Sequence, residues 1–171
     1  MPAVRSGYDE AVKPRVYLET TIPSYLTAWL SRDLVRAAHQ QLTREWWEKR
    51  REQFELFVSQ VVVGECQAGD ATAAVERLAI LEGLPLLEQT EEATRLAQAL
   101  LKHVPLPDRA ALDALHIALA AVHGMDYLLT WNCTHIANAT LREPFESVCR
   151  SNGYEPPAIC TPEELLSEGG D

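Results

Sequence analysis

Residues 113–132 read DALHIALAAVHGMDYLLTWN and combine the two signals on which the fold assignment depends. The first part is apolar on nearly every side, which is typical of a helix buried in a protein core. Gly124 ends that helix, which we expect to span residues 109–123 with Asp108 as its cap. Residues 126–130 then predict a buried strand. A buried helix followed at once by a buried strand indicates an α/β fold with a parallel sheet.

The same alternation of strands and helices extends along the chain. Strands are expected at residues 16–18, 55–59, 84–87, 126–130 and 158–160, and helices at 32–54, 61–66, 71–82, 91–103, 109–123 and 138–150. Residues 161–164 (TPEE) carry a further helix-start signature. The pattern predicts a three-layer α/β/α sandwich with a central, mainly parallel sheet. We expect a single domain at residues 15–166, with tails at 1–14 and 167–171.

Composition narrows the functional classes. The 171 residues include 15 Lys and Arg and 25 Asp and Glu, for a formal net charge of −10. A protein that binds nucleic acid by charge alone is basic, so this balance disfavours a histone-like role but permits a nuclease whose carboxylates hold cations. The sequence has neither an apolar run of membrane-spanning length nor a secretory-type N-terminus, so we expect a cytoplasmic protein that does not enter the membrane. The four cysteines form no Cys-x-x-Cys pair, which disfavours a zinc ribbon.

Three acidic residues are expected at one edge of the predicted sheet. Glu19 follows the first strand, Glu65 lies in the helix after the second strand, and Asp113 lies in the helix that leads to the fourth. Ligands of open α/β folds bind at the carboxyl ends of the strands. Carboxylate oxygens suit Mg²⁺ or Mn²⁺, and such a site hydrolyses phosphodiesters by activating water. The alternative is that these acids are ordinary solvated side chains, but the apolar surroundings of Asp113 favour a site.

Polar residues near these acids extend the candidate site: Thr20, His116, Thr130, Asn132 and His135. Thr20 either donates a hydrogen bond to the site or caps the next helix. His116, on the same helix face as Asp113, is either a core histidine bonded to a neighbour or a site group that contacts substrate phosphate or orients Asp113. Residues 44–51 (REWWEKRR) are either an arm that stacks on RNA or an amphipathic helix that buries one Trp.

Four stretches together resemble the PIN-domain ribonucleases, a family that includes the VapC-like toxins of bacterial toxin–antitoxin pairs. They read VYLETTIPSYL, ELFVSQVVVGECQAG, DALHIALAAVHGMDYLLTWN and ICTPEELL, and their order and spacing match across residues 15–166. The resemblance implies an α/β/α sandwich that cleaves RNA with Mg²⁺ or Mn²⁺ as cofactor. It also implies that Glu19, Glu65 and Asp113 are the catalytic metal ligands.

Two positions depart from the family pattern. Glu19 stands where an Asp is common, which lengthens the side chain by one methylene. The family often has a further acid just after Thr-x-Asn, whereas residues 130–135 read TWNCTH here. Asn132 and His135 therefore occupy that region, and His135 becomes a candidate ligand for Mn²⁺ or a softer metal. These departures imply a site that binds a single ion, prefers Mn²⁺, or is weak or inactive.

The sequence predicts a metal-dependent endoribonuclease that hydrolyses RNA, acting as a toxin with an antitoxin protein as its partner. The alternative is a catalytically degenerate PIN-like module that binds RNA or a protein. Absence of a Gly-x-Gly-x-x-Gly or Walker loop disfavours nucleotide binding. The apolar surface of helix 32–54 predicts a homodimer. Repulsion among the acids predicts that Asp113→Ala leaves the metal-free protein at least as stable as wild type.

Overall fold

The computed structural model describes residues 11–167 and contains a five-stranded sheet in the order β3-β2-β1-β4-β5. Every neighbouring pair of strands is parallel. The strands are β1 (Arg15–Leu18), β2 (Glu55–Ser59), β3 (Leu86–Leu87), β4 (Tyr127–Leu129) and β5 (Ala158–Cys160). The central strand is β1, where Tyr17 pairs with Phe57 of β2 on one side and with Leu128 of β4 on the other.

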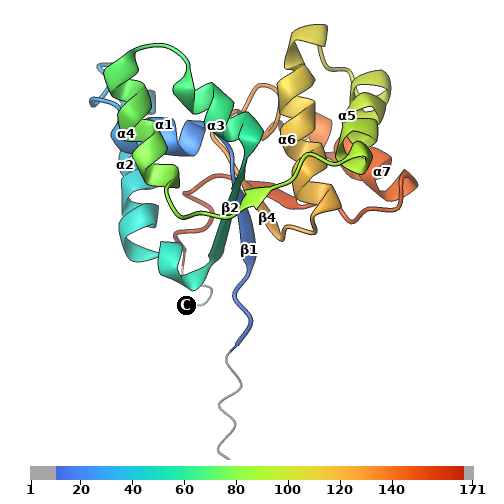
Figure 1. The fold of residues 1–171 in the computed structure, drawn as a ribbon, viewed down its shortest axis with the longest axis horizontal. Coiled ribbons are helices and arrows are strands. Elements are labelled where there is room, and N and C mark those ends of the chain that lie inside the picture. Colours follow the sequence, from blue (N-terminus) through green and yellow to red (C-terminus); the bar gives the residue numbers. More distant parts are fainter. Residues whose placement is uncertain (1–10, 168–171) are drawn as a thin grey trace, which may run out of the picture.

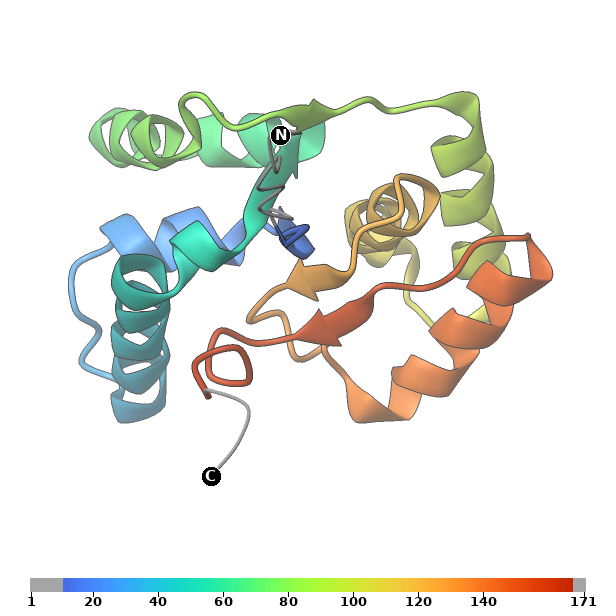
Figure 2. The same cartoon turned by 90° about the horizontal axis from the view of Figure 1, so that it is seen from below.

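Helices cover both faces of the sheet. They are α1 (Thr21–Thr27), α2 (Leu34–Lys49), α3 (Gln60–Gln67), α4 (Ala71–Leu81), α5 (Glu91–His103), α6 (Ala111–Val122) and α7 (Ala139–Ser151). The chain first moves from β1 outward to β3 and then crosses back to β4 and β5. Because parallel crossovers are right-handed, this reversal places α1–α4 on one face and α5–α7 on the other (Figures 1 and 2). The predicted α/β/α sandwich is confirmed.

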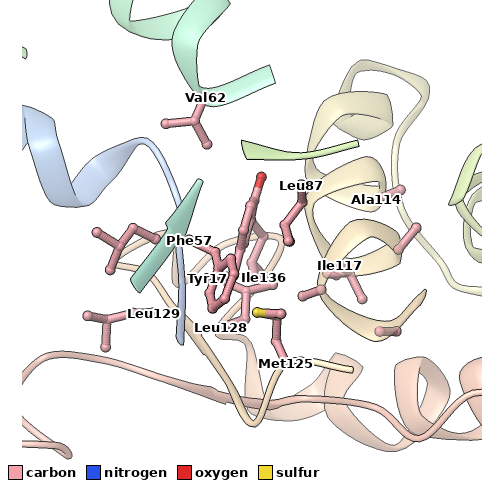
Figure 3. Close-up of a cluster of buried hydrophobic side chains, with 14 of the residues drawn as sticks. Tyr17, Phe57, Val62, Leu87, Ala114, Ile117, Met125, Leu128, Leu129 and Ile136 are labelled. Carbon is pink, nitrogen blue, oxygen red and sulfur yellow. The ribbon is translucent and has the colours of Figure 1, made fainter. Parts of the chain in front are cut away.

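The core is centred on β1. Val16, Tyr17 and Leu18 have no exposed surface, because both faces of this strand are covered by helices. Apolar side chains of the neighbouring strands and of α6 surround Tyr17 (Figure 3). Its hydroxyl oxygen points toward the α3 end of the sheet (Figure 3). Complete burial of each large aliphatic side chain contributes about 1.5–3 kcal/mol, so this cluster fixes the strands that carry the site.

Side-chain caps begin several helices where the sequence places them. Ser59 Oγ accepts a hydrogen bond from the Val62 amide of α3 at 3.4 Å, and Thr90 Oγ1 accepts one from the Ala93 amide of α5 at 3.2 Å. The predicted cap at Asp108 is wrong. Residues 108–110 form a 3₁₀ turn, and α6 begins at Ala111 without a side-chain cap. Because this turn lies between Asp108 and α6, the Asp108 side chain does not accept hydrogen bonds from the first amides of the helix.

Three other elements differ from the prediction in length or type. The helix expected at 32–54 is shorter, because Asp33 caps α2 and residues 51–53 form a 3₁₀ turn. The third strand is limited to Leu86–Leu87. The helix expected from residue 161 is absent from the described residues, where 161–166 form successive turns with hydrogen bonds three residues apart. Thr161 Oγ1 donates to Glu164 Oε1 at 3.3 Å, and within the described residues it accepts no hydrogen bond from an amide.

Residues 1–10 and 168–171 of the predicted tails lie outside the described range, and residues 11–14 are exposed. Within residues 11–167, no helix is both long and apolar enough to cross a bilayer.

The cysteines are free thiols, of which Cys133 is exposed and the other three are buried: Cys66, Cys149 and Cys160. Burial raises the pKa of Cys66 and Cys149 to about 11 and that of Cys160 to about 12.

Candidate active site

The three candidate carboxylates lie at the carboxyl edge of the sheet, around the point where the chain reverses between β1 and β4. Glu19 directly follows β1, and its amide donates to the Leu129 carbonyl of β4 at 3.0 Å. Glu65 lies in α3, which leaves the carboxyl end of β2. Asp113 lies in the first turn of α6, which begins at the same edge (Figure 1). The topology therefore gathers acids from both halves of the chain at one edge.

Glu19 is almost completely buried, with 4% of its surface exposed. Its Oε2 atom accepts hydrogen bonds from Thr130 Oγ1 at 2.7 Å, Thr21 Oγ1 at 2.6 Å and the Thr21 amide at 3.1 Å. Thr21 Oγ1 in turn accepts from the Trp131 amide at 2.8 Å. The ends of β1 and β4 thus hold one oxygen of Glu19. Within residues 11–167, its Oε1 atom has no hydrogen-bond partner.

Glu65 is held through its Oε1 atom. His116 Nε2 lies 2.6 Å from this oxygen, and Thr20 Oγ1 donates to it at 2.8 Å. Burial raises the pKa of Glu65, but hydrogen bonding and electrostatic attraction by His116 and the hydrogen bond from Thr20 outweigh it. The pKa therefore lies below its usual value, and the carboxylate is ionised at neutral pH.

Asp113 has a partner on each oxygen. Asn132 Nδ2 donates to Oδ1 at 3.1 Å, and His135 Nδ1 lies 2.9 Å from Oδ2. Asn132 is itself fixed, because its amide donates to Thr130 Oγ1 at 2.9 Å and its Oδ1 accepts from the His135 amide at 3.0 Å. The segment after β4 therefore wraps around Asp113, whose side chain is 20% exposed.

These contacts join the site into a connected arrangement. Thr130 bonds both Glu19 and the amide of Asn132, which links the first acid to Asp113. Thr20 follows Glu19 in the chain and bonds Glu65. Every predicted auxiliary residue contacts an acid or the loop that holds one: Thr20, His116, Thr130, Asn132 and His135.

The structure also decides between alternatives that the sequence left open. Thr20 makes no cap hydrogen bond to α1 and donates to Glu65 instead. His116 is a fully buried core histidine bonded to a neighbour, since its Nε2 lies 2.6 Å from Glu65 Oε1, and it does not orient Asp113. Residues 44–49 belong to the amphipathic helix α2, which buries Trp46 completely, and the Arg51 guanidinium covers the Trp47 ring at 4.9 Å.

Sequence reasoning missed two residues next to the site. The Tyr17 hydroxyl lies 2.7 Å from Ser59 Oγ and 2.7 Å from His116 Nδ1. Burial raises the pKa of Tyr17 well above its usual value, and the charges of Glu19 and Glu65 add to this effect, so the hydroxyl stays protonated. A tyrosine between aliphatic residues in a strand resembles any core aromatic. The sequence feature that could have indicated this role is a tyrosine in a buried strand, because a buried tyrosine hydroxyl needs a hydrogen-bond partner.

The donors at this edge suit a hard divalent cation, because they are carboxylate oxygens. As the side chains lie, however, the described residues contain no group of three or more His, Cys, Asp and Glu placed to hold a metal ion. Both oxygens of Asp113 contact protein groups, Asn132 and His135, whereas Glu65 contacts His116 and Thr20 through one oxygen only. The shared ion stays a prediction.

When the chain is compared with known protein families, one family matches it. The sequence profile described as the PIN domain matches residues 16–132, which is 117 of the 171 residues. The matched range contains all three acids. No curated protein matches the chain.

Proposed function

The chain belongs to the PIN domain family, and from this membership and the geometry of the site we propose that it is a metal-dependent endoribonuclease. PIN domains are generally metal-dependent nucleases. The observation that carries the proposal is the placement of Glu19, Glu65 and Asp113, which come from separate elements at the switch point of the sheet. Hydrogen bonds through Thr130 and Asn132 link Glu19 to Asp113, and Thr20, the residue after Glu19, bonds Glu65.

The three acids are the proposed ligands of Mg²⁺ or Mn²⁺. Glu19 and Glu65 each make their hydrogen bonds through one oxygen, which leaves the second oxygen for an ion. Asp113 would hold the ion through a lone pair that its contacts with Asn132 and His135 leave free. When bound, the cation activates water and offsets the charge that develops on the phosphodiester. Thr130 and Thr21 keep Glu19 in place throughout.

A second candidate is a PIN-like module without catalytic activity that binds RNA or a protein. The observation in its favour is that protein donors already satisfy both oxygens of Asp113, where Asn132 and His135 replace the further acid of the family. Such a module cleaves no RNA at any metal concentration.

A metal titration with labelled single-stranded RNA decides between these candidates. We expect cleavage that requires Mn²⁺ or Mg²⁺ and that disappears in Asp113→Asn. A matched control is Asp126→Asn, since Asp126 is exposed and precedes β4 at the opposite edge of the sheet. Its variant should cleave as wild type does. Cleavage without added metal, or unchanged cleavage by Asp113→Asn, contradicts the proposal. A DNA strand of the same sequence tests the preference for RNA.

The proposed toxin role requires partners. Large apolar side chains are exposed around the start of α2, namely Trp29 at 96%, Leu30 at 59%, Leu34 at 86% and Val35 at 64%. Exposed apolar clusters favour association, so we propose this surface for the homodimer. Light scattering of wild type and of Leu34→Ser tests it.

We also propose an antitoxin protein as partner. The test is expression of the protein in cells: we expect growth arrest, which Asp113→Asn should abolish and which co-expression of a neighbouring gene should relieve.

A further inference from the structure

We propose that Ser59, Tyr17 and His116 form a buried line of hydrogen bonds that positions Glu65 for metal binding. The line runs from Ser59 Oγ to the Tyr17 hydroxyl (2.7 Å), from this hydroxyl to His116 Nδ1 (2.7 Å), and from His116 Nε2 to Glu65 Oε1 (2.6 Å). The inference rests on the proposed function, in which Glu65 is a ligand. Tyr17 and His116 are positioning residues, because they act through Glu65.

The burial of its three polar side chains indicates that this line does more than fill space in the core. Ser59 is 1% exposed, and Tyr17 and His116 are not exposed at all. Burying a polar side chain is costly unless it is hydrogen-bonded, and aliphatic residues would fill the same space without that requirement. Each polar group in the line satisfies the next, and the line ends at Glu65, the member whose side chain is 33% exposed. The buried groups therefore support the one that faces solvent.

Direction along the line follows from chemistry. The ionised Glu65 carboxylate has no proton, so His116 Nε2–H donates to it. The contact of Nδ1 with the Tyr17 hydroxyl sets the orientation of the imidazole ring. Rotation of the ring would break both contacts at once. The position of Glu65 Oε1 is thus fixed by a ring that is held on its opposite side.

The line also closes on the helix from which Glu65 projects. Ser59 is the N-cap of α3, where its Oγ accepts from the Val62 amide. Glu65 lies in the same helix, so α3 is attached to the line at its first turn and again at Glu65. The two attachments pass through β1 and α6, which belong to different layers of the sandwich. This loop of contacts restrains α3 from turning about its axis and keeps the Glu65 carboxylate against His116.

Calorimetric titration of the folded, metal-free protein with Mn²⁺ tests the inference without using catalysis. Groups that hold a metal ligand in place are worth about 10–100-fold in metal affinity. We therefore expect His116→Leu to weaken Mn²⁺ binding by about 10-fold or more. His116→Gln retains a donor for Glu65 and should keep most of the affinity. Tyr17→Phe, which frees the ring, should fall between them.

Tyr127→Phe is the matched control. Tyr127 lies on β4 beside Val16 of β1, and within the described residues its hydroxyl makes no hydrogen bond. Its variant should bind Mn²⁺ as wild type does. Far-ultraviolet circular dichroism at the titration temperature confirms that each variant is folded, and Tyr17→Phe decides the question if His116→Leu is unfolded.

The outcomes separate the two proposals. Wild type that binds no Mn²⁺ overturns the proposed function, and this inference with it. Wild-type binding together with unchanged affinity in folded His116→Leu or Tyr17→Phe overturns the positioning line and leaves the nuclease proposal standing. A loss in His116→Gln equal to that in His116→Leu also contradicts the inference, because the donor to Glu65 would then be irrelevant.

Discussion

Replacing Asp113 by Ala in the metal-free protein should lower the free energy of unfolding. The variant loses the hydrogen bonds from Asn132 and His135, each worth about 1 kcal/mol at this partly exposed position. It also loses a negative charge in the first turn of α6, worth about 0.3–1 kcal/mol. The higher helix propensity of Ala returns about 0.6 kcal/mol. The net cost is about 2 kcal/mol, which reverses the expectation from charge repulsion alone.

Thermal melts of both proteins, with and without Mn²⁺, measure this effect. In a chain of this length 1 kcal/mol corresponds to about 2–4 °C, so metal-free Asp113→Ala should melt about 4–8 °C below wild type. Mn²⁺ at 100 times its dissociation constant should stabilise wild type by about 2.7 kcal/mol and leave the variant unchanged. Asp113→Asn, which keeps an acceptor for Asn132, should melt between the two.

Two results refute the reasoning. If metal-free Asp113→Ala melts with wild type, the contacts of Asn132 and His135 contribute nothing, and repulsion between the acids balances them. If Mn²⁺ raises the melting temperature of the variant as much as that of wild type, Asp113 is not a ligand.

Three further predictions concern the framework. Trp46→Ala, at a fully buried site, should cost about 3–5 kcal/mol in urea unfolding, whereas Val75→Ala, at a 67% exposed site, should stay within about 0.5 kcal/mol of wild type. Gly124→Ala should cost about 1 kcal/mol by the same measurement, because Gly124 has φ +66°. Ellman's reagent should modify Cys133 alone in the folded protein and all four thiols after denaturation, and a second fast thiol would contradict the burial of the others.

Local sequence signals predicted the architecture because strands and helices differ in their hydrophobic period. The strand at 55–59, the caps at Ser59 and Thr90 and the alternation of elements all follow from neighbours in the chain. The errors arose where side chains had competing local partners. At residues 161–164 the Thr161 hydroxyl bonds Glu164 rather than an amide, and at Asp108 a 3₁₀ turn intervenes.

The acids of the site were predictable, but their partners were less so. Glu19 and Asp113 stand out because an acid within an apolar segment is unusual. The contact between Tyr17 and His116 joins residues 99 positions apart, and that between Tyr17 and Ser59 joins residues 42 apart. No local pattern encodes such pairs. That Asn132 and His135 both bind Asp113 likewise depends on the course of the loop after β4.

The position of β1 has a consequence for synthesis. This strand is synthesised before the other strands of the sheet, yet it lies in the middle of the sheet and pairs with β4, where Val16 meets Tyr127. At about 5–20 residues per second, the 110 residues between Val16 and Tyr127 take about 6–22 s to translate. Throughout that interval one edge of β1 lacks its neighbour, and Glu19 lacks Thr130. A nascent chain therefore contains the three acids before it contains the residues after β4 that bind two of them. The site forms only after those residues have left the ribosome.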